Sequence, residues 1–142
     1  MQRFTYPVTL TPDEVDGGYV VTCRDVPEVV TQGETIEDGI NEAEGALEAA
    51  IEMRIEDSMA VPVPSAKRRG EYLASLPVGT AMKAALYVSM QEQNVSKAEL
   101  ARRLGLDEKE TRRMLDPKHG TKVPALERAL HALGKRVELV VV

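Results

Sequence analysis

Apolar and polar residues alternate through the first part of the chain. Every second residue is apolar in the opening stretch, at Phe4, Tyr6, Val8 and Leu10, which is the pattern of a half-buried β-strand. The turn at residues 13–18 (DEVDGG) contains two glycines suited to positive φ, so residues 19–23 are expected to return as the second strand of a hairpin. A third strand is predicted over residues 29–32, ending at Gly33. This pattern predicts an antiparallel sheet.

The spacing of the apolar positions changes after Thr35, which is expected to cap a long helix with Asp38 in its first turn. Apolar residues then recur three or four apart, as on the buried face of a helix, at Ile36, Ile40, Ala43, Leu47, Ala50 (or Ile51) and Ile55. Residues 60–64 (AVPVP) fit at most an edge strand, because a proline cannot donate to a central ladder. We assign residues 1–66 to a domain with an antiparallel sheet and one long helix, and residues 67–78 to a linker, within which residues 71–76 could pack on either domain.

Residues 79–142 are predicted to form a helical domain, which makes the fold class α+β. Helices are expected over residues 80–94 and 123–133, and residues 136–142 (RVELVVV) read as a terminal strand. Between the helices, Ser96–Leu115 (SKAELARRLGLDEKETRRML) can form two short helices joined by a tight turn.

Two capping boxes and a glycine support this pair of short helices. Ser96 with Glu99, and Asp107 with Glu110, have the spacing of residues that cap a helix start reciprocally. Gly105 stands where the first helix would end in a left-handed conformation. The combination predicts a helix-turn-helix, although Thr111 takes a place usually given to an apolar packing residue.

Basic residues suggest what this motif does. A helix in the major groove reads base edges, and cations neutralise phosphates. We expect DNA contacts from five residues of the motif and the loop after it, at Lys97, Lys109, Arg112, Arg113 and Lys118. The alternative is an ordinary helix pair with a solvated basic face.

Charge is divided unevenly along the chain, whose net charge is −5. Residues 1–66 hold three basic and fourteen acidic residues, a net charge of −11, whereas residues 67–142 hold fifteen and nine, a net charge of +6. The basic half fits nucleic acid, and the acidic half would attract a basic partner. Alternatively, the acidic surface only aids solubility.

Candidate catalytic chemistry is sparse. Cys23 is the only cysteine, and His119 and His131 do not form a recognisable pair. The carboxylates of the first turn, Asp13 among them, fit a solvated turn better than a metal site. We therefore expect no enzyme, no metal and no cofactor. No apolar run approaches the ~20 residues of a membrane span, and the first residues lack signal-peptide features, so we expect a cytoplasmic protein without a membrane partner.

The order of these features resembles HicB-type antitoxins. The resemblance lies in Tyr6–Leu47, in Ser96–Pro117 and in Leu126–Val142, and so covers nearly the whole chain. It implies an N-terminal domain with a partial, non-catalytic ribonuclease-H-like fold that binds and blocks a small basic HicA toxin, an mRNA-cleaving ribonuclease. It also implies a C-terminal domain that binds the operator of the toxin–antitoxin pair and represses it. The alternative is a helix-turn-helix regulator whose N-terminal domain senses a small molecule.

The terminal stretch predicts self-association. An exposed apolar strand edge invites pairing, and pairing with a second copy closes the contact. We expect a homodimer, or a higher even oligomer, held by the apolar residues Val137, Leu139, Val140 and Val141. The alternative is that this strand extends the N-terminal sheet.

Overall fold

The computed structural model describes residues 3–142, which form two compact units. The sheet unit comprises the chain up to Arg54 together with Val61–Pro77, and the helical unit comprises Ile55–Ala60 and Val78–Val142. Among the described residues, no helix is both long and apolar enough to span a membrane.

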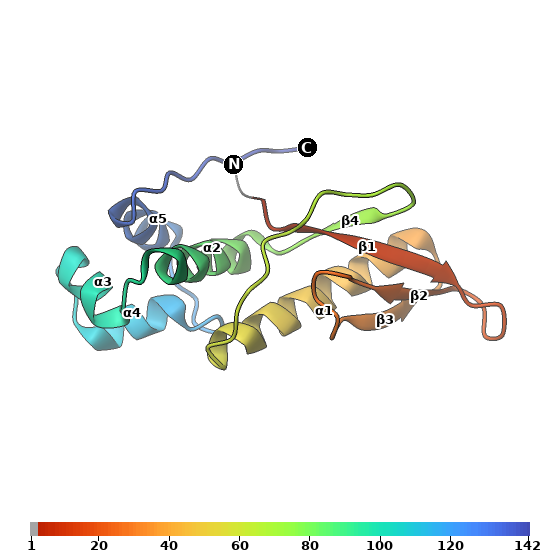
Figure 1. Ribbon diagram of the computed structural model, residues 1–142, viewed down its shortest axis with the longest axis horizontal. Helices are drawn as coiled ribbons and strands as arrows, with labels where there is room; N and C mark the ends of the chain where they lie inside the picture. The colour runs from red at the N-terminus through yellow and green to blue at the C-terminus, as the bar shows by residue number, and fades with distance from the viewer. Residues whose placement is uncertain (1–2) are drawn as a thin grey trace. The chain divides into compact units, whose positions relative to one another are not determined.

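The sheet unit is a four-stranded antiparallel sheet with one long helix (Figure 1). The strands are β1 (Thr5–Pro12), β2 (Tyr19–Thr22), β3 (Val30–Gly33) and β4 (Tyr72–Ser75), in the spatial order β3-β2-β1-β4. The helix α1 (Ile36–Glu56) begins in this unit, and its last two residues belong to the helical unit. The α+β class and the antiparallel sheet with a long helix are confirmed.

One face of the sheet is buried, and the other is largely exposed apart from the buried Pro7. The side chains of Tyr6, Val8, Val21 and Ala74 are fully buried, as are Ala43, Leu47 and Ile51 on the inner face of α1. Thr9 and Thr22, which are paired across β1 and β2, are exposed on the other face. The start of α1 lies very close to β3, because a Cβ on Gly33 would stand only 2.3 Å from the backbone nitrogen of Gly39.

The fourth strand corrects the expected linker. Residues 72–75 pair with β1 from Thr5↔Ser75 to Val8↔Tyr72, whereas residues 60–64 form no strand. A bidentate ion pair fixes the approach to β4, since Arg24 Nε and Nη2 donate to the two carboxylate oxygens of Glu71 at 2.8 and 3.0 Å. This long-range pair could not be read from local spacing.

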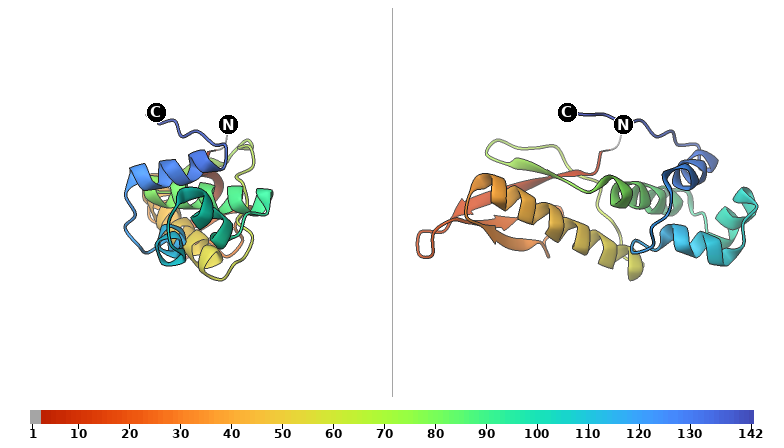
Figure 2. Two further views of the ribbon diagram at one scale, coloured as in Figure 1. Left: turned by 90° about the vertical axis from the view of Figure 1, so that its left-hand side faces the viewer. Right: turned by 180° about the vertical axis from the view of Figure 1, so that it is seen from behind.

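The helical unit contains α2 (Val78–Gln93), α3 (Lys97–Leu104), α4 (Glu108–Leu115) and α5 (Val123–Ala132). Their shared core is apolar and includes Leu86, Leu100, Met114, Leu126 and Leu130. Figure 2 shows these helices from two further sides.

The terminal strand predicted over residues 136–142 is not formed. This segment has no regular secondary structure, and Leu139, Val141 and Val142 are 79%, 88% and 109% exposed. The described helical unit offers no strand to satisfy its backbone, and the four-stranded sheet does not include it. The prediction of a terminal strand was therefore wrong for the single chain.

Candidate nucleic-acid interface and acidic surface

The two predicted short helices are present as α3 and α4, and local capping explains both. Ser96 Oγ accepts from the Glu99 amide at 3.0 Å, and Asp107 Oδ1 accepts from the Glu110 amide at 2.8 Å. Gly105 ends α3 with φ of 65°, and the Leu106 amide then donates to the Ala101 carbonyl at 3.0 Å. This left-handed residue lets the chain reverse without the steric cost that a Cβ would add.

The reciprocal half of the first capping box is replaced by ion pairs. The Glu99 carboxylate accepts from Arg102 and Arg103, at distances of 2.6 to 3.0 Å. The hydrogen bond from Arg102, followed by that from Arg103, lowers the pKa of Glu99 to about 2. These two arginines are therefore partly neutralised on the protein itself.

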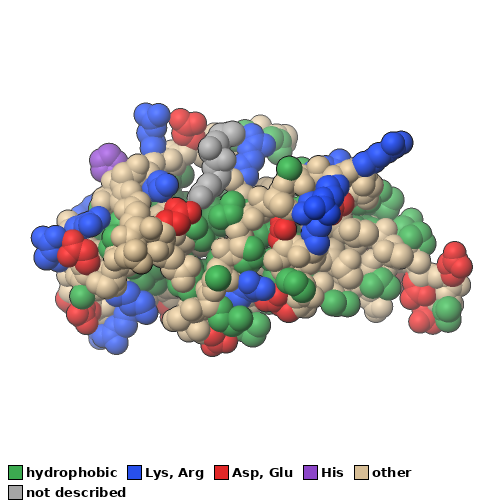
Figure 3. Space-filling model, in the orientation of Figure 1, with side chains coloured by type: hydrophobic (Ala, Val, Ile, Leu, Met, Phe, Trp, Pro, Cys, Tyr) green, Lys and Arg blue, Asp and Glu red, His purple; other side chains and the backbone are tan. Residues whose placement is uncertain are grey.

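The basic face of α4 is exposed. Lys109, Arg112 and Arg113 are exposed, and together with Asp116 they line a shallow hollow. Figure 3 shows Lys and Arg side chains gathered over the end of the helical unit where α3 and α4 lie. The opposite face of α4 is buried through Met114 and Leu115. Three of the five predicted DNA contacts are therefore brought together on one helix.

The other two predicted contacts lie outside this hollow. Lys97 is exposed in the first turn of α3. Lys118 follows α4, and its Nζ lies 3.5 Å from Glu56 Oε1. Its charge is therefore shared with a carboxylate of the helical unit, which sequence spacing did not indicate.

Thr111 fits the core despite its hydroxyl group. The residue is fully buried, and Thr111 Oγ1 donates to the Asp107 carbonyl at 3.1 Å. A buried hydroxyl with a partner avoids most of the cost of desolvation. The departure noted in the sequence therefore does not break the packing of α4 onto its neighbours.

Lys83 is the residue that sequence reasoning missed. It lies on α2, is only 3% exposed, and donates from Nζ to the carbonyls of Arg113 at 3.4 Å, His119 at 2.5 Å and Asp116. A cation at the C-terminal end of a helix meets the negative end of its dipole. Lys83 therefore fixes the end of α4 and the loop that follows. Its only sequence signal is a lysine within an otherwise apolar stretch, AMKAAL.

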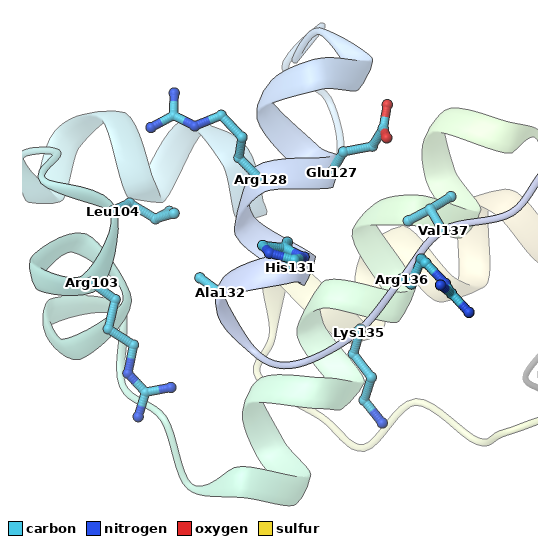
Figure 4. Close-up of a pocket in the computed structure, with 9 residues that line it drawn as sticks. All are labelled: Arg103, Leu104, Glu127, Arg128, His131, Ala132, Lys135, Arg136 and Val137. Atoms are coloured by element: carbon cyan, nitrogen blue, oxygen red, sulfur yellow. The ribbon is translucent and has the colours of Figure 1, made fainter.

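A second hollow lies between α3, α5 and the segment after α5 (Figure 4). Its cationic lining residues are Arg103, Arg128, Lys135 and Arg136, with Glu127 and His131 beside them. Arg103 is bound to Glu99, and Arg136 Nε lies 3.9 Å from Glu138 Oε1. The hollow has mixed charge, and sequence reasoning did not single it out.

The sheet unit is acidic. It holds six basic and thirteen acidic residues, a net charge of −7, whereas the helical unit holds twelve and ten, a net charge of +2. The contrast is smaller than between the halves of the sequence, mainly since residues 67–69 (KRR) belong to the sheet unit and the acidic Glu56 and Asp57 belong to the helical unit.

The carboxylates of the hairpin turn between β1 and β2 have two different roles. Asp13 Oδ1 accepts from the amides of Val15 and Asp16 at 3.0 and 3.1 Å, so it stabilises the turn. Glu14 and Asp16 remain exposed, and acidic side chains mark the hairpin tip in Figure 3. Across residues 3–142, no three His, Cys, Asp or Glu side chains gather in a way that could hold a metal ion.

These features define a two-part α+β protein, with an acidic sheet unit followed by a helical unit that exposes a basic helix. Residues 5–85 match the family described as the HicB-like antitoxin of bacterial toxin–antitoxin systems. The chain belongs to this family.

Full-length relatives support the assignment. The chain is 38% identical to antitoxin HicB of Escherichia coli (strain K12) over 137 residues, which are 96% of this chain and 99% of the relative. It is 39% identical to antitoxin HicB 2 of Photorhabdus laumondii over 141 residues, 99% of each chain. Antitoxin HicB of Pseudomonas fluorescens is 34% identical over 135 residues, 94% of this chain and 92% of the relative. These likenesses do not favour the small-molecule-sensing alternative.

Proposed function

We propose that the protein is an antitoxin that binds and inhibits a HicA-type mRNA-cleaving ribonuclease and represses its own operon by binding operator DNA. The observation that carries this proposal is the near-full-length likeness to antitoxins, which spans both units. The sheet unit has the charge to bind a basic toxin, and the helical unit exposes the cations to bind DNA. The chain acts by binding, not by catalysis.

Operator binding is assigned to the exposed face of α4. Arg112 and Arg113 contact the operator, with Lys109 as a lesser partner and Lys97 and Lys118 at the margins. Loss of a base-reading arginine costs ~1–3 kcal/mol and relaxes specificity, while loss of a phosphate contact weakens binding to all sequences alike.

The test is operator affinity measured by fluorescence anisotropy at fixed salt. The double variant Arg112→Ala, Arg113→Ala is expected to bind far more weakly, whereas Arg128→Ala, an exposed arginine on α5, serves as the matched control. Unchanged affinity of the double variant would refute the assignment to α4.

Toxin binding is assigned to the acidic surface of the hairpin and α1. Opposite charges accelerate encounter, and salt weakens the attraction. The variant Glu14→Gln, Asp16→Gln removes two exposed charges but leaves the structural Asp13 in place. It is expected to slow association with the toxin and reduce the salt dependence, whereas Glu92→Gln, exposed on α2, should not. Full inhibition by a fragment of residues 78–142 alone would contradict this assignment.

Dimerisation is assigned to the apolar terminal segment, through Val137, Leu139, Val140 and Val141. Its exposure in the single chain is the reason, because such a segment gains a partner by pairing with a second copy across a two-fold axis. A dimer would present two copies of α4 to symmetric half-sites. Light scattering of a chain lacking residues 136–142 tests this, and an unchanged mass with unchanged operator affinity would exclude the segment.

A further inference from the structure

The outer edge of β3 carries backbone groups that point away from the sheet. The Asp13 amide donates to the Gly18 carbonyl at 2.9 Å, so this pair is hydrogen-bonded. Hydrogen-bonded and non-hydrogen-bonded pairs alternate along an antiparallel ladder. Continuing along the β1–β2 register, Val20 and Thr22 turn their amides toward β1, and Tyr19 and Val21 turn theirs toward β3.

The same alternation continues into β3. Its pairs with β2 are Tyr19↔Gly33 and Val21↔Thr31, which exchange hydrogen bonds, and Val20↔Gln32 and Thr22↔Val30, which do not. Val30 and Gln32 therefore direct their amides and carbonyls outward. Both residues are exposed, Val30 by 66%, and in the described part of the chain no side-chain acceptor reaches either amide.

The opposite edge of the sheet, on β4, is covered at only one of its two outward positions. Leu73, two residues before Ser75, also faces outward in this register and is 48% exposed. On β4, Ser75 occupies the corresponding outward position, and its amide donates to Glu44 Oε2 of α1 at 2.8 Å. Proteins usually block edge strands with charges, prolines or covering segments. The sequence of β3, VTQG, contains no charge and no proline. An edge left open beside an apolar side chain is suited to accept another strand.

The acidic residues around β3 favour a basic partner strand at this edge over a second copy of the chain. Residues 25–53, which contain β3 and most of α1, include nine acidic residues and no Lys or Arg. Two of the nine are paired with the flanking arginines, Asp25 with Arg24 and Glu28 with Arg54. Glu34 and Glu37, just after β3, are exposed. A second copy of this edge would bring like charges together, whereas a strand flanked by lysines and arginines would be attracted.

We propose that the outer edge of β3 binds an extended strand of a basic partner protein, adding a fifth strand to the sheet. Main-chain hydrogen bonds to Val30 and Gln32 give the affinity, as in other cases of strand addition. The acidic residues around β3 select a basic strand. This inference rests on the proposed function, because the basic partner is the HicA-type toxin that the chain is proposed to inhibit.

The test uses the full chain and an inactive form of that toxin. Gln32→Pro removes one outward amide without removing a hydrogen bond to β2, and proline is tolerated on edge strands. Gln32→Ala removes the side chain and keeps the amide, so it is the matched control. Toxin affinity measured by calorimetry is expected to fall about tenfold for Gln32→Pro and to stay within about twofold for Gln32→Ala, where tenfold corresponds to ~1.4 kcal/mol.

Amide hydrogen exchange of the unmodified chain gives a second readout, which does not depend on the folding of the variant. The Val30 and Gln32 amides should exchange quickly in the free chain and at least about tenfold more slowly in the complex, whereas Thr31, already bound to β2, should be slow in both. Toxin bound and inhibited without protection of Val30 and Gln32 would overturn the edge proposal alone. No toxin binding by the unmodified chain would overturn the proposed function with it. Protection that rises with the concentration of the free chain would show that a second copy occupies the edge, which also overturns the proposal.

Discussion

Replacing Lys83 with methionine tests whether a buried cation on α2 holds the end of α4. The side chain is 3% exposed, and Nζ donates to three carbonyls of residues 113–119. Methionine has a similar length and no donor, so the change removes the charge and the hydrogen bonds while largely keeping the volume.

The magnitude follows from two opposing effects. A hydrogen bond from a charged donor contributes ~1.5–3 kcal/mol, and a well-placed cation at a helix C-terminus contributes up to ~2 kcal/mol. Removing the ammonium also relieves its own desolvation, which offsets part of the loss. We therefore expect the free energy of unfolding of the helical unit to fall by roughly 2–4 kcal/mol.

Urea denaturation followed by circular dichroism measures the loss, and amide exchange over residues 111–116 shows whether it is centred on the end of α4. Operator affinity should fall as well, because α4 carries the proposed contacts. Arg128→Met is the control for both measurements, since Arg128 is exposed on α5, lies outside the proposed DNA contacts, and surface substitutions usually change stability by less than about 0.5 kcal/mol. If Lys83→Met unfolds like the unmodified chain within that margin, the proposed role of Lys83 is wrong.

Three further outcomes are expected from the structure. The hydrogen bond from Arg24 lowers the pKa of Glu71 to about 2 from its ordinary value of 4.5. The Glu71 carboxylate therefore contributes fully to stability above about pH 4.5, and this contribution is lost as the pH falls toward 2. In acid titrations over this range, the free energy of unfolding should fall less steeply for Glu71→Gln than for the unmodified chain. Gly45→Ala should raise the free energy of unfolding by up to about 1 kcal/mol, and with it the melting temperature, because a Cβ there meets nothing within 4 Å. Gly33→Ala should lower the melting temperature sharply, because its Cβ would stand 2.3 Å from the backbone nitrogen of Gly39. Thr111→Val should change the free energy of unfolding by less than about 1 kcal/mol, since the Asp107 carbonyl keeps its bond from the Thr111 amide; a loss of several kcal/mol would show that the hydroxyl is essential.

The features predicted well from the sequence are the local ones. The caps at Ser96 and Asp107 and the left-handed Gly105 depend on neighbours three or four residues away, which the sequence displays directly. The first two strands and α1 follow from apolar periodicity for the same reason. The ribonuclease-H-like assignment stays a prediction from the resemblance, and the helix-turn-helix assignment stays a prediction from the sequence.

The missed features depend on residues far apart in the chain. β4 lies within the range assigned to a linker and was not predicted as a strand, because its identity as a strand comes from pairing with β1 and from the Arg24–Glu71 pair, 47 positions apart. Lys83 meets its carbonyls about 30 residues later, at distances no periodicity encodes. Residues 136–142 have the apolar composition of a strand, and a strand was predicted there. They have no strand to pair with in the described chain, so a single copy does not form it.

The late position of β4 has a consequence for synthesis. β1 ends at residue 12 and its partner β4 ends at residue 75, so the ribosome makes 63 further residues before the sheet can close. At ~5–20 residues per second this delay is roughly 3–13 s. During that interval the side of β1 that later receives β4 is bare in the nascent chain, and α1 has no completed sheet to cover. A translation product that stops between residues 57 and 71 would contain β3 and the whole of α1 but no fourth strand, and would be an incomplete folding unit exposed to proteases and aggregation.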